Sequence, residues 1–223
     1  MIITHCMFDF DGTLVDSVGD VRECLTSAFA KSGIAAESLN VAAFMQLQLR
    51  EAIASIAPYI GPEEIDRVVA EFRTIYDASN YPATRLMAGV TALLPELRAR
   101  SVDMTIVSNK RHIPTLRILD KFGLRGFFDA VYNPDMDPGG PAMTKGRMIA
   151  RAIDERGLSR KTTLYIGDSE VDVAAAHENE LPSAIVANGY GGIGSFTLQP
   201  TYIVKEISGI LSIDGLFRPG PVH

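Results

Sequence analysis

The sequence predicts an α/β fold, with a doubly wound, Rossmann-like parallel sheet as its core and an inserted α-helical cap domain. Two patterns lead to this prediction. Through the second half of the chain, short apolar runs alternate with amphipathic helical stretches, as in a parallel sheet covered by helices on both faces. After the first predicted strand, that alternation gives way to helical spacing alone. The 223 residues, 47% hydrophobic and 22% charged, suffice for one core domain and a large insertion.

The predicted elements of the core follow one another as strands and helices in turn. Buried strands are predicted at residues 2–8, 104–107, 130–132, 163–166 and 183–186, and residues 202–204 are a weaker edge candidate. Helices are predicted between them at residues 90–100, 113–122, 145–156 and 170–179. The main motifs described below follow the first, second and fourth of these strands.

The inserted segment contains several consecutive helical patterns and no convincing strand. Apolar positions such as Leu25 and Phe29, and later Val68, Phe72 and Tyr76, recur at helical spacing. We therefore expect residues 16–86 to form the helical cap, and residues 1–15 and 87–223 to form the α/β catalytic core.

Composition excludes several classes of function. A net charge of −6 and a pI near 5.2 argue against nucleic-acid binding, which calls for a basic face. No apolar run is long enough for a membrane span or a secretion signal, so a soluble, cytoplasmic protein without a membrane partner is predicted. Cys6 and Cys24 lack the spacing of a zinc or redox site, and we expect buried free thiols. The oligomeric state stays open.

The first chemical motif follows the first predicted strand. Asp9 and Asp11 flank Phe10, and alternation along an extended segment sends both carboxyl groups to the same side. Gly12 then permits a turn. Two carboxylates buried at a strand end repel each other unless a cation lies between them. The motif therefore implies a metal, although a lone pair of this kind also occurs in turns and helix caps.

A second acidic motif follows the fourth predicted strand. Asp168 ends the strand and Asp172 lies one helical turn further on, so both can face the carboxyl edge of the sheet. An oxygen-only ligand set favours Mg²⁺ over zinc. The alternative is that both residues simply cap the following helix, which is compatible with metal binding.

Residues suited to binding phosphate lie between the two acidic motifs. Ser108 and Asn109 follow the second predicted strand near a helix start, which is a plausible phosphate cradle. Lys145 opens a later helix, where its ammonium could neutralise a phosphate or a carboxylate. Lys110 and Arg111 are expected to be solvated, with a smaller chance that they reach the phosphate. His112 and His177 are likewise expected at the surface, because neither has an obvious partner.

Taken in order, these motifs resemble those of the haloacid dehalogenase-like hydrolase superfamily. The resemblance covers nearly the whole chain and rests on Asp9-Phe10-Asp11-Gly12-Thr13, Ser108, Lys145 and Gly167-Asp168-Ser169-Glu170-Val171-Asp172. It implies that Asp9 forms an aspartyl-phosphate and that Asp11 is the acid and base. It further implies that Ser108 binds the phosphoryl group and that Lys145 steadies its charge.

The resemblance also implies a metal site and a substrate class. Asp9, the backbone carbonyl of Asp11 and Asp168 would hold Mg²⁺. Asp172 would be either a further ligand through water or the partner of Lys145. Gly12, Thr13 and Asn109 are expected at the substrate, which would be a small phosphorylated metabolite.

The helical insertion resembles the cap of a subclass that includes phosphoglycolate phosphatases, pyrophosphatases and β-phosphoglucomutases. Ser108-Asn109-Lys110 and Asn188-Gly189-Tyr190-Gly191 favour the phosphoglycolate phosphatase-like branch. In the cap, Arg50 could grip a substrate carboxylate, or pair with an acid such as Glu51 or Glu64. The predicted function is hydrolysis of a small phosphomonoester, with 2-phosphoglycolate as the first candidate. A β-phosphoglucomutase-like transferase and, less favoured, a phospho-accepting signalling module remain alternatives.

Overall fold

A computed structural model describes residues 2–35, 41, 45, 47–137, 143–192, 194 and 196–220 of the chain. Its core is a six-stranded sheet with the strand order β5-β4-β1-β6-β7-β8, and every neighbouring pair runs parallel. The strands are β1 (His5–Phe8), β4 (Asp103–Val107), β5 (Ala130–Tyr132), β6 (Thr163–Gly167), β7 (Ser183–Val186) and β8 (Tyr202–Val204). The predicted α/β fold class is therefore confirmed.

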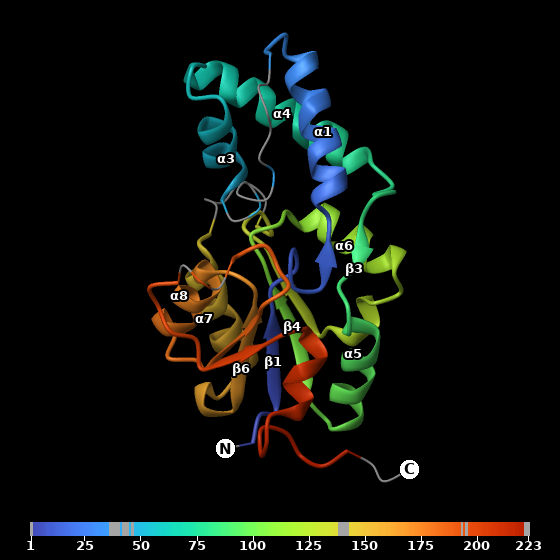
Figure 1. Ribbon diagram of the computed structural model, residues 1–223, viewed down its shortest axis with the longest axis vertical. Coiled ribbons are helices and arrows are strands. Elements are labelled where there is room, and N and C mark those ends of the chain that lie inside the picture. Colours follow the sequence, from blue (N-terminus) through green and yellow to red (C-terminus); the bar gives the residue numbers. More distant parts are fainter. Residues whose placement is uncertain are drawn as a thin grey trace. The chain divides into compact units, whose positions relative to one another are not determined.

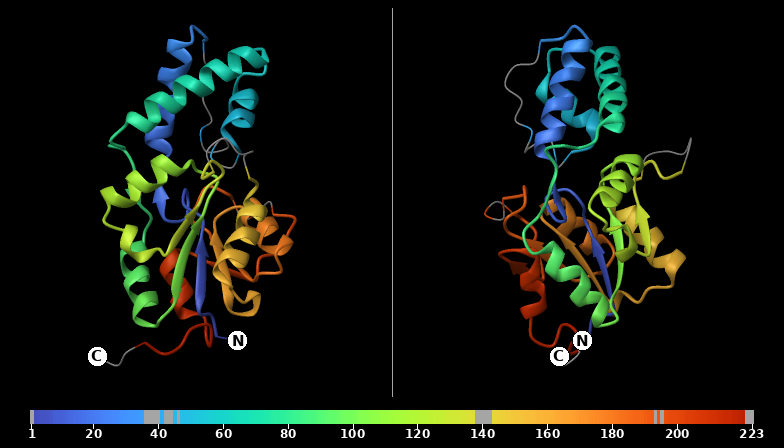
Figure 2. Two further views of the ribbon diagram at one scale, coloured as in Figure 1. Left: turned by 180° about the vertical axis from the view of Figure 1, so that it is seen from behind. Right: turned by 90° about the vertical axis from the view of Figure 1, so that its right-hand side faces the viewer.

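Helices cover both faces of this sheet, as Figures 1 and 2 show. Helices α7 (Lys145–Arg156) and α8 (Glu170–Glu178) lie against one face, and α5 (Val90–Ala99) and α6 (His112–Lys121) lie on the other. Short 3-10 helices occur at η1 (Arg125–Phe127), η2 (Arg160–Thr162) and η4 (Ile207–Ser212). The face under α7 and α8 buries strand residues together with helix residues: Met7, Val107, Tyr165, Met148, Ile149 and Ala176.

The parallel arrangement brings the ends of separate strands to one edge of the sheet. Phe8 of β1 pairs with Ile106 of β4 and with Ile166 of β6. The residues that directly follow these strands are therefore neighbours, although they are far apart in the sequence. Asp9, Ser108 and Asp168 directly follow β1, β4 and β6 and therefore lie at this edge.

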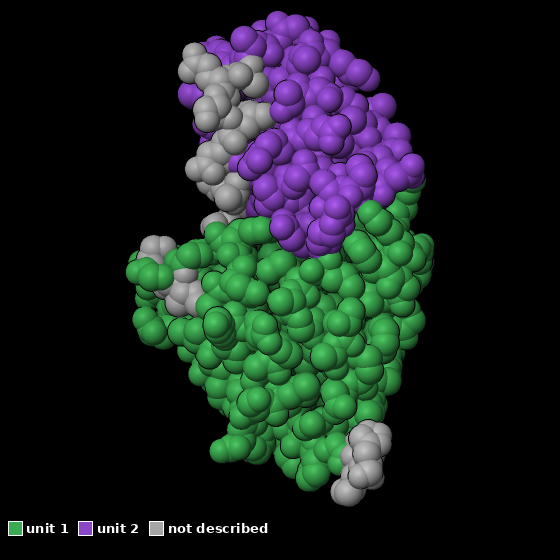
Figure 3. Space-filling model, turned by 45° about the vertical axis from the view of Figure 1, so that its right-hand side comes forward, with its two compact units in different colours: residues 1–15, 86–223 green, residues 16–85 purple. Residues whose placement is uncertain are grey.

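The chain divides into two compact units, coloured green and purple in Figure 3. One unit comprises residues 1–15 and 86–223, and the other comprises residues 16–85. The chain passes from one to the other at β2 (Val15–Asp16) and β3 (Arg85–Leu86), which pair as a two-stranded sheet.

The smaller unit is helical and consists of α1 (Val18–Lys31), α3 (Leu49–Ile56) and α4 (Pro62–Ala78) in its described part. Its interior contains an aromatic group in which Phe72 stacks on Tyr76, with 5.1 Å between the ring centroids. The apolar spacing that predicted helices in this segment thus corresponds to a packed interior.

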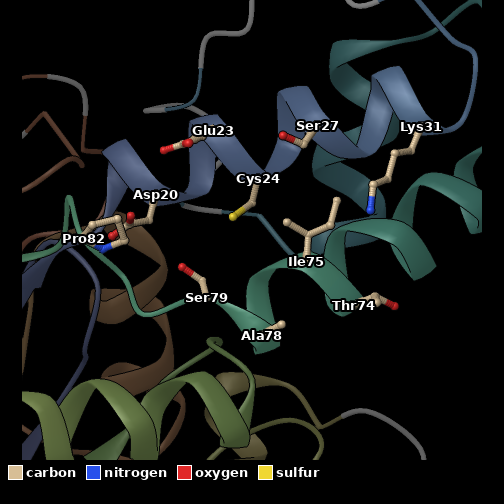
Figure 4. Close-up of a pocket in the computed structure, with 10 residues that line it drawn as sticks. All are labelled: Asp20, Glu23, Cys24, Ser27, Lys31, Thr74, Ile75, Ala78, Ser79 and Pro82. Carbon is tan, nitrogen blue, oxygen red and sulfur yellow. The ribbon is translucent and has the colours of Figure 1, made fainter.

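A cavity of about 400 Å³ lies between α1 and α4 of the helical unit (Figure 4). Cys24 lines this cavity and is buried, as is Cys6 in β1, and both thiols are free. Burial raises the pKa of Cys24 to about 11 and raises that of Cys6 further. The expectation of buried free thiols is confirmed. Within the described part of the chain, no helix combines the length and the apolar character needed to cross a membrane.

Candidate active site

Asp9 lies at the carboxyl edge of the sheet, directly after β1. Its backbone N–H donates to the carbonyl of Ile166 at 2.8 Å, which extends the pairing of β1 with β6 by one residue. Its side chain is only 10% exposed. The turn that follows has Gly12 at φ 81°, a left-handed conformation that glycine adopts without strain. The chain can therefore reverse immediately after Asp11.

Lys145 joins two of the buried carboxylates. Its ammonium lies 3.0 Å from Asp9 Oδ2 and 2.6 Å from Asp172 Oδ1, and its side chain is 5% exposed. It occupies the first position of α7, whose preceding residue Thr144 accepts a hydrogen bond from the Arg147 N–H. Burial alone would lower the pKa of Lys145, but the carboxylates of Asp172 and Asp9 outweigh it and raise the pKa above its ordinary value. Lys145 therefore stays charged at the carboxylate of Asp9.

Asp172 is the most fully bonded of the acidic residues. Its Oδ2 accepts from the N–H groups of Asp168 and Ser169 and from the Ser169 hydroxyl, at 3.1, 2.9 and 2.7 Å. Its Oδ1 accepts from Lys145 and, at 3.3 Å, from the Tyr165 hydroxyl. Burial tends to raise the pKa of Asp172, but Lys145 and these donors hold it below its ordinary value. Of the two roles considered for Asp172, the geometry supports that of partner to Lys145.

Asp168 stands beside Asp172 at the end of β6 and is 3% exposed. The Tyr190 N–H donates to its Oδ2 at 2.6 Å, and the Thr13 hydroxyl is 3.5 Å from its Oδ1. Thr13 is fully buried, so it supports Asp168 and offers no surface that a substrate could reach. Gly12 likewise lies against this carboxylate, because a Cβ there would be 2.3 Å from Asp168 Oδ2.

The side chain of Lys110 is buried, so the expectation that it is solvated is wrong. Its ammonium donates to both oxygens of Asp11, at 3.1 and 3.0 Å, and its side chain is 5% exposed. Arg111 is partly exposed and forms an ion pair with Asp135 at 3.1 Å. No local pattern indicates the Lys110 contact, because Lys110 and Asp11 lie 99 positions apart in the sequence.

Asn133 is a functional candidate that sequence reasoning missed. It follows β5 and is fully buried. Its amide nitrogen donates to the carbonyl of Lys110 at 2.7 Å and to Thr115 Oγ1 at 3.3 Å. Its Oδ1 lies 2.9 Å from Nδ1 of His112, so the expectation that His112 has no partner is wrong. The loop that carries Ser108 and Lys110 is thus fixed from the neighbouring strand.

Ser108 and Asn109 lie at the beginning of this braced loop, at the same edge as Asp9. Ser108 is 2% exposed, and its N–H donates to the carbonyl of Tyr132 at 3.0 Å. Its hydroxyl oxygen accepts from the Lys110 N–H at 3.3 Å. The Ser108 side chain also forms a hydrogen bond with Asp9, which acts to lower the pKa of that carboxyl group. Asn109 Oδ1 is buried and has no hydrogen-bond partner among the described residues.

Arg50 belongs to the helical unit. It forms an ion pair with Asp66 of α4, and both side chains are at least half exposed. Its partner is therefore neither Glu51 nor Glu64. An exposed pair of this kind contributes little to stability, so its charge stays accessible to other anions.

The core unit fits a hard divalent cation. Asp9, Asp168 and Asp172 present carboxylate oxygens within 4.8 Å of one another. Asp9 Oδ1 is buried and lacks a hydrogen-bond partner within the described part of the chain, which is costly unless a cation binds it. Lys110 and Lys145 form ion pairs with Asp11, Asp9 and Asp172; set against the four carboxylates of Asp9, Asp11, Asp168 and Asp172, these two ammonium groups leave two negative charges, which one divalent cation would balance. Oxygen-only donors suit Mg²⁺.

Metal-free protein has two carboxyl groups with raised pKa values. Burial, followed by the charges of Asp172 and Asp9, raises the pKa of Asp168 from 3.8 to about 8. Burial likewise raises the pKa of Asp9 to about 6, although Lys145 acts against it. At pH values between 3.8 and these raised pKa values, Asp9 and Asp168 hold protons in the folded state that they have released in the unfolded chain.

We expect the free energy of unfolding in EDTA to fall as the pH rises from 6 to 8, because the unfolded state binds fewer protons throughout that interval. The stability linked to these protons is complete below about pH 4 and is lost as the pH passes the raised values. Urea unfolding at several pH values measures this, with Asp168→Asn as the control that should flatten the slope. Equal slopes in the two proteins would contradict the assignment to Asp168. Added Mg²⁺ should stabilise more at pH 8 than at pH 6.

Comparison with known proteins agrees with this arrangement. The family model for haloacid dehalogenase-like hydrolases matches residues 6–186 of the chain. A phosphoglycolate phosphatase of Cereibacter sphaeroides (strain ATCC 17029) is 31% identical over 204 residues, which cover 82% of this chain and 85% of that protein. A phosphoglycolate phosphatase of Agrobacterium fabrum is 26% identical over 211 residues, which cover 92% and 89% of the two chains.

Solved structures share the fold over almost the full length. A haloacid dehalogenase-like hydrolase from Streptococcus pneumoniae matches with a TM-score of 0.83 and 25% identity, over 94% of this chain and 97% of that one. CbbY from Rhodobacter sphaeroides, solved in complex with phosphate, matches with a TM-score of 0.79 over 94% and 96%. At 17% identity, the second likeness shows the fold alone.

Proposed function

This chain belongs to the haloacid dehalogenase-like hydrolase family, and we propose that it is a phosphatase that hydrolyses small phosphomonoesters with Mg²⁺ through a phosphorylated Asp9. The observation that carries the proposal is the state of Asp9. One of its oxygens is held by Lys145 at 3.0 Å, whereas the other is buried without a hydrogen-bond partner among the described residues. A carboxylate presented in this way can react, because nothing but a metal or a substrate would fill its free side.

In the proposed reaction, a carboxylate oxygen of Asp9 attacks phosphorus and the bond from phosphorus to the ester oxygen breaks. Asp11 donates a proton to the leaving oxygen, which departs as an alcohol. Asp11 then takes a proton from water as that water attacks the phosphorus of the acyl phosphate. Phosphate leaves, and the carboxylate of Asp9 is restored. Splitting one displacement into two lowers each barrier.

The other residues position and neutralise charge in this scheme. Ser108 would bind a phosphoryl oxygen, and Lys145 would offset the charge that gathers between Asp9 and the phosphoryl group. Mg²⁺, held by Asp9, Asp168 and the backbone carbonyl of Asp11, would supply further positive charge at the phosphoryl oxygens. Since Lys110 binds both oxygens of Asp11, at least one of these bonds has to open before Asp11 can transfer a proton.

The relatives support a proposal for the substrate class. Several that match most of the chain are phosphoglycolate phosphatases, so we propose 2-phosphoglycolate as the first candidate. An exposed Arg50 in the helical unit could pair with a carboxylate of such a substrate, in exchange for Asp66. A phosphotransferase of the β-phosphoglucomutase kind would use the same Asp9 and Asp11 and is the second candidate.

The test is a panel of phosphorylated metabolites, assayed for phosphate release with Mg²⁺ and with EDTA. We expect Mg²⁺-dependent release, with kcat/KM highest for two-carbon and three-carbon phosphates that carry a carboxylate. Conversion of a hexose phosphate into its isomer with little free phosphate would reverse the choice between hydrolase and transferase. An acyl phosphate that persists for minutes, without turnover, would point instead to a phospho-accepting signalling module.

A further inference from the structure

The turn after β7 lies against Asp168. It consists of Gly189, Tyr190 and Gly191, and it reaches the acidic motif across 22 positions of sequence between Asp168 and Tyr190. The Tyr190 N–H donates to Asp168 Oδ2 at 2.6 Å. A backbone donor cannot rotate away as a side chain can, so this bond fixes the direction of the carboxyl group.

The two glycines make this close approach possible. A Cβ on Gly189 would lie 2.2 Å from the Cβ of Asp168. A Cβ on Gly191 would lie 2.2 Å from the backbone carbonyl oxygen of Asp168. Both distances are far inside van der Waals contact, and the Gly191 distance is to rigid backbone. Any larger residue at either position would therefore push Asp168 or the turn aside.

The far end of the same loop is also anchored beside Asp168. The carboxylate of Glu170, two residues after Asp168, accepts from the N–H groups of Thr197 and Leu198 at 2.7 and 3.1 Å. Tyr190 is thus hydrogen-bonded to Asp168, just before α8, and Thr197 and Leu198 are hydrogen-bonded to Glu170, the first residue of α8.

The two oxygens of Asp168 therefore have different surroundings. Oδ2 accepts from the Tyr190 N–H, whereas the contact that Oδ1 makes among the described residues is a long one, 3.5 Å to the Thr13 hydroxyl. A group that forms a hydrogen bond with a metal-ligating residue orients that residue and thereby affects the affinity of the site for the metal.

We propose that the turn formed by Gly189, Tyr190 and Gly191 is the positioning element that orients Asp168 and thereby sets the affinity of the protein for its divalent cation. This inference rests on the proposed function only in that the cation binds at Asp168. It assigns a role to three residues that contribute no side-chain ligand.

The first experiment compares substitutions in one loop. Gly189→Ala and Gly191→Ala introduce the Cβ that meets Asp168, whereas Gly194→Ala introduces one in open space and is the matched control. Mn²⁺ binding to the substrate-free protein is measured by electron paramagnetic resonance of the free ion. We expect the first two variants to bind Mn²⁺ about 10- to 100-fold more weakly, the range known for residues that orient a metal ligand. Gly194→Ala should bind as the wild type does.

A second pair of variants separates the N–H group from the ring. Tyr190→Ala removes the ring and keeps the donor, whereas Tyr190→Pro removes both. We expect Tyr190→Ala to keep its Mn²⁺ affinity and Tyr190→Pro to lose about tenfold or more. This readout does not depend on catalytic activity.

Two outcomes would overturn the inference. Wild-type Mn²⁺ affinity in the glycine variants or in Tyr190→Pro would show that the turn does not orient Asp168. Loss of folded structure in these variants, seen by circular dichroism without metal, would show that the turn maintains the fold instead. A wild-type protein that binds no Mn²⁺ at millimolar concentration would contradict the metal requirement of the proposed function as well, and that result is distinct from the other two.

Discussion

Replacement of Asp9 by asparagine is expected to lower phosphate release by a factor on the order of 10⁴ or more, as loss of a covalent nucleophile does in other enzymes. The amide has nearly the shape of the carboxylate but cannot form an acyl phosphate. The fold should tolerate the change, because burial raises the pKa of Asp9 to about 6 and its ionised form is therefore unfavourable in the metal-free protein. Steady-state release from the best substrate of the panel, with Mg²⁺ at saturation, measures the effect.

The control for Asp9→Asn is Asp154→Asn, which changes the same kind of group at an exposed position of α7. Its activity should equal that of the wild type. Rapid acid quench of the wild type should yield a phosphorylated protein that hydroxylamine cleaves, and Asp9→Asn should yield none. Comparable turnover by Asp9→Asn and the wild type would remove Asp9 from its proposed role, whatever the substrate.

The fold and the positions of the acidic motifs were predictable because both depend on local patterns. Apolar runs located every strand of the sheet, and parallel pairing then brings residues that follow β1 and β6 to one edge. Asp9 and Asp168 could be placed near each other from this rule alone. Lys145 was harder, because its helix begins 13 residues after β5 ends at Tyr132.

The surroundings of these residues could not be predicted in the same way. The ammonium of Lys110 donates to Asp11, and Asn133, which follows a different strand, donates to the carbonyl of Lys110. Likewise, Asp168 is held by a backbone N–H from residue 190. Such contacts join positions that no helical or strand periodicity relates, and a backbone donor has no signature in its own side chain. The glycines on either side of Tyr190 are the feature of the sequence that points to this close backbone approach.

Loss of Asp172 is the second change with a large expected effect, since its carboxylate is fully buried and accepts bonds from Lys145, Ser169, the Asp168 N–H and Tyr165. Asp172→Ala leaves the Lys145 ammonium paired, among the described residues, with Asp9 alone and leaves buried donors unsatisfied. We expect the free energy of unfolding to fall by about 3–5 kcal/mol, the usual effect of breaking a buried ion pair from one side. Urea unfolding at pH 7 in EDTA measures it.

The pH dependence of the Asp172 contribution has a fixed sign. Because its pKa is lowered in the folded state, the stability it provides is complete above its ordinary value of 3.8 and is lost only as the pH falls below that value. Its own ionisation therefore adds no pH dependence between pH 6 and pH 8. Because the charge of Asp172 also raises the pKa of Asp168, the fall in stability over this interval should be smaller in Asp172→Ala, and the loss relative to the wild type should shrink as the pH rises. A loss that grew with pH would contradict the assignment of the raised Asp168 pKa to the charge of Asp172.

A double variant distinguishes the ion pair from simple packing. If the main cost of Asp172→Ala is a buried ammonium short of a partner, then removing that ammonium should restore part of the stability. We expect Lys145→Met together with Asp172→Ala to lose less than the sum of the two single changes, with a coupling energy of about 1–3 kcal/mol. Strict additivity would show that Asp172 stabilises the turn at Asp168 and Ser169 independently of Lys145. Activity should be lost in the double variant under either result, because Asp9 would then lack the ammonium of Lys145.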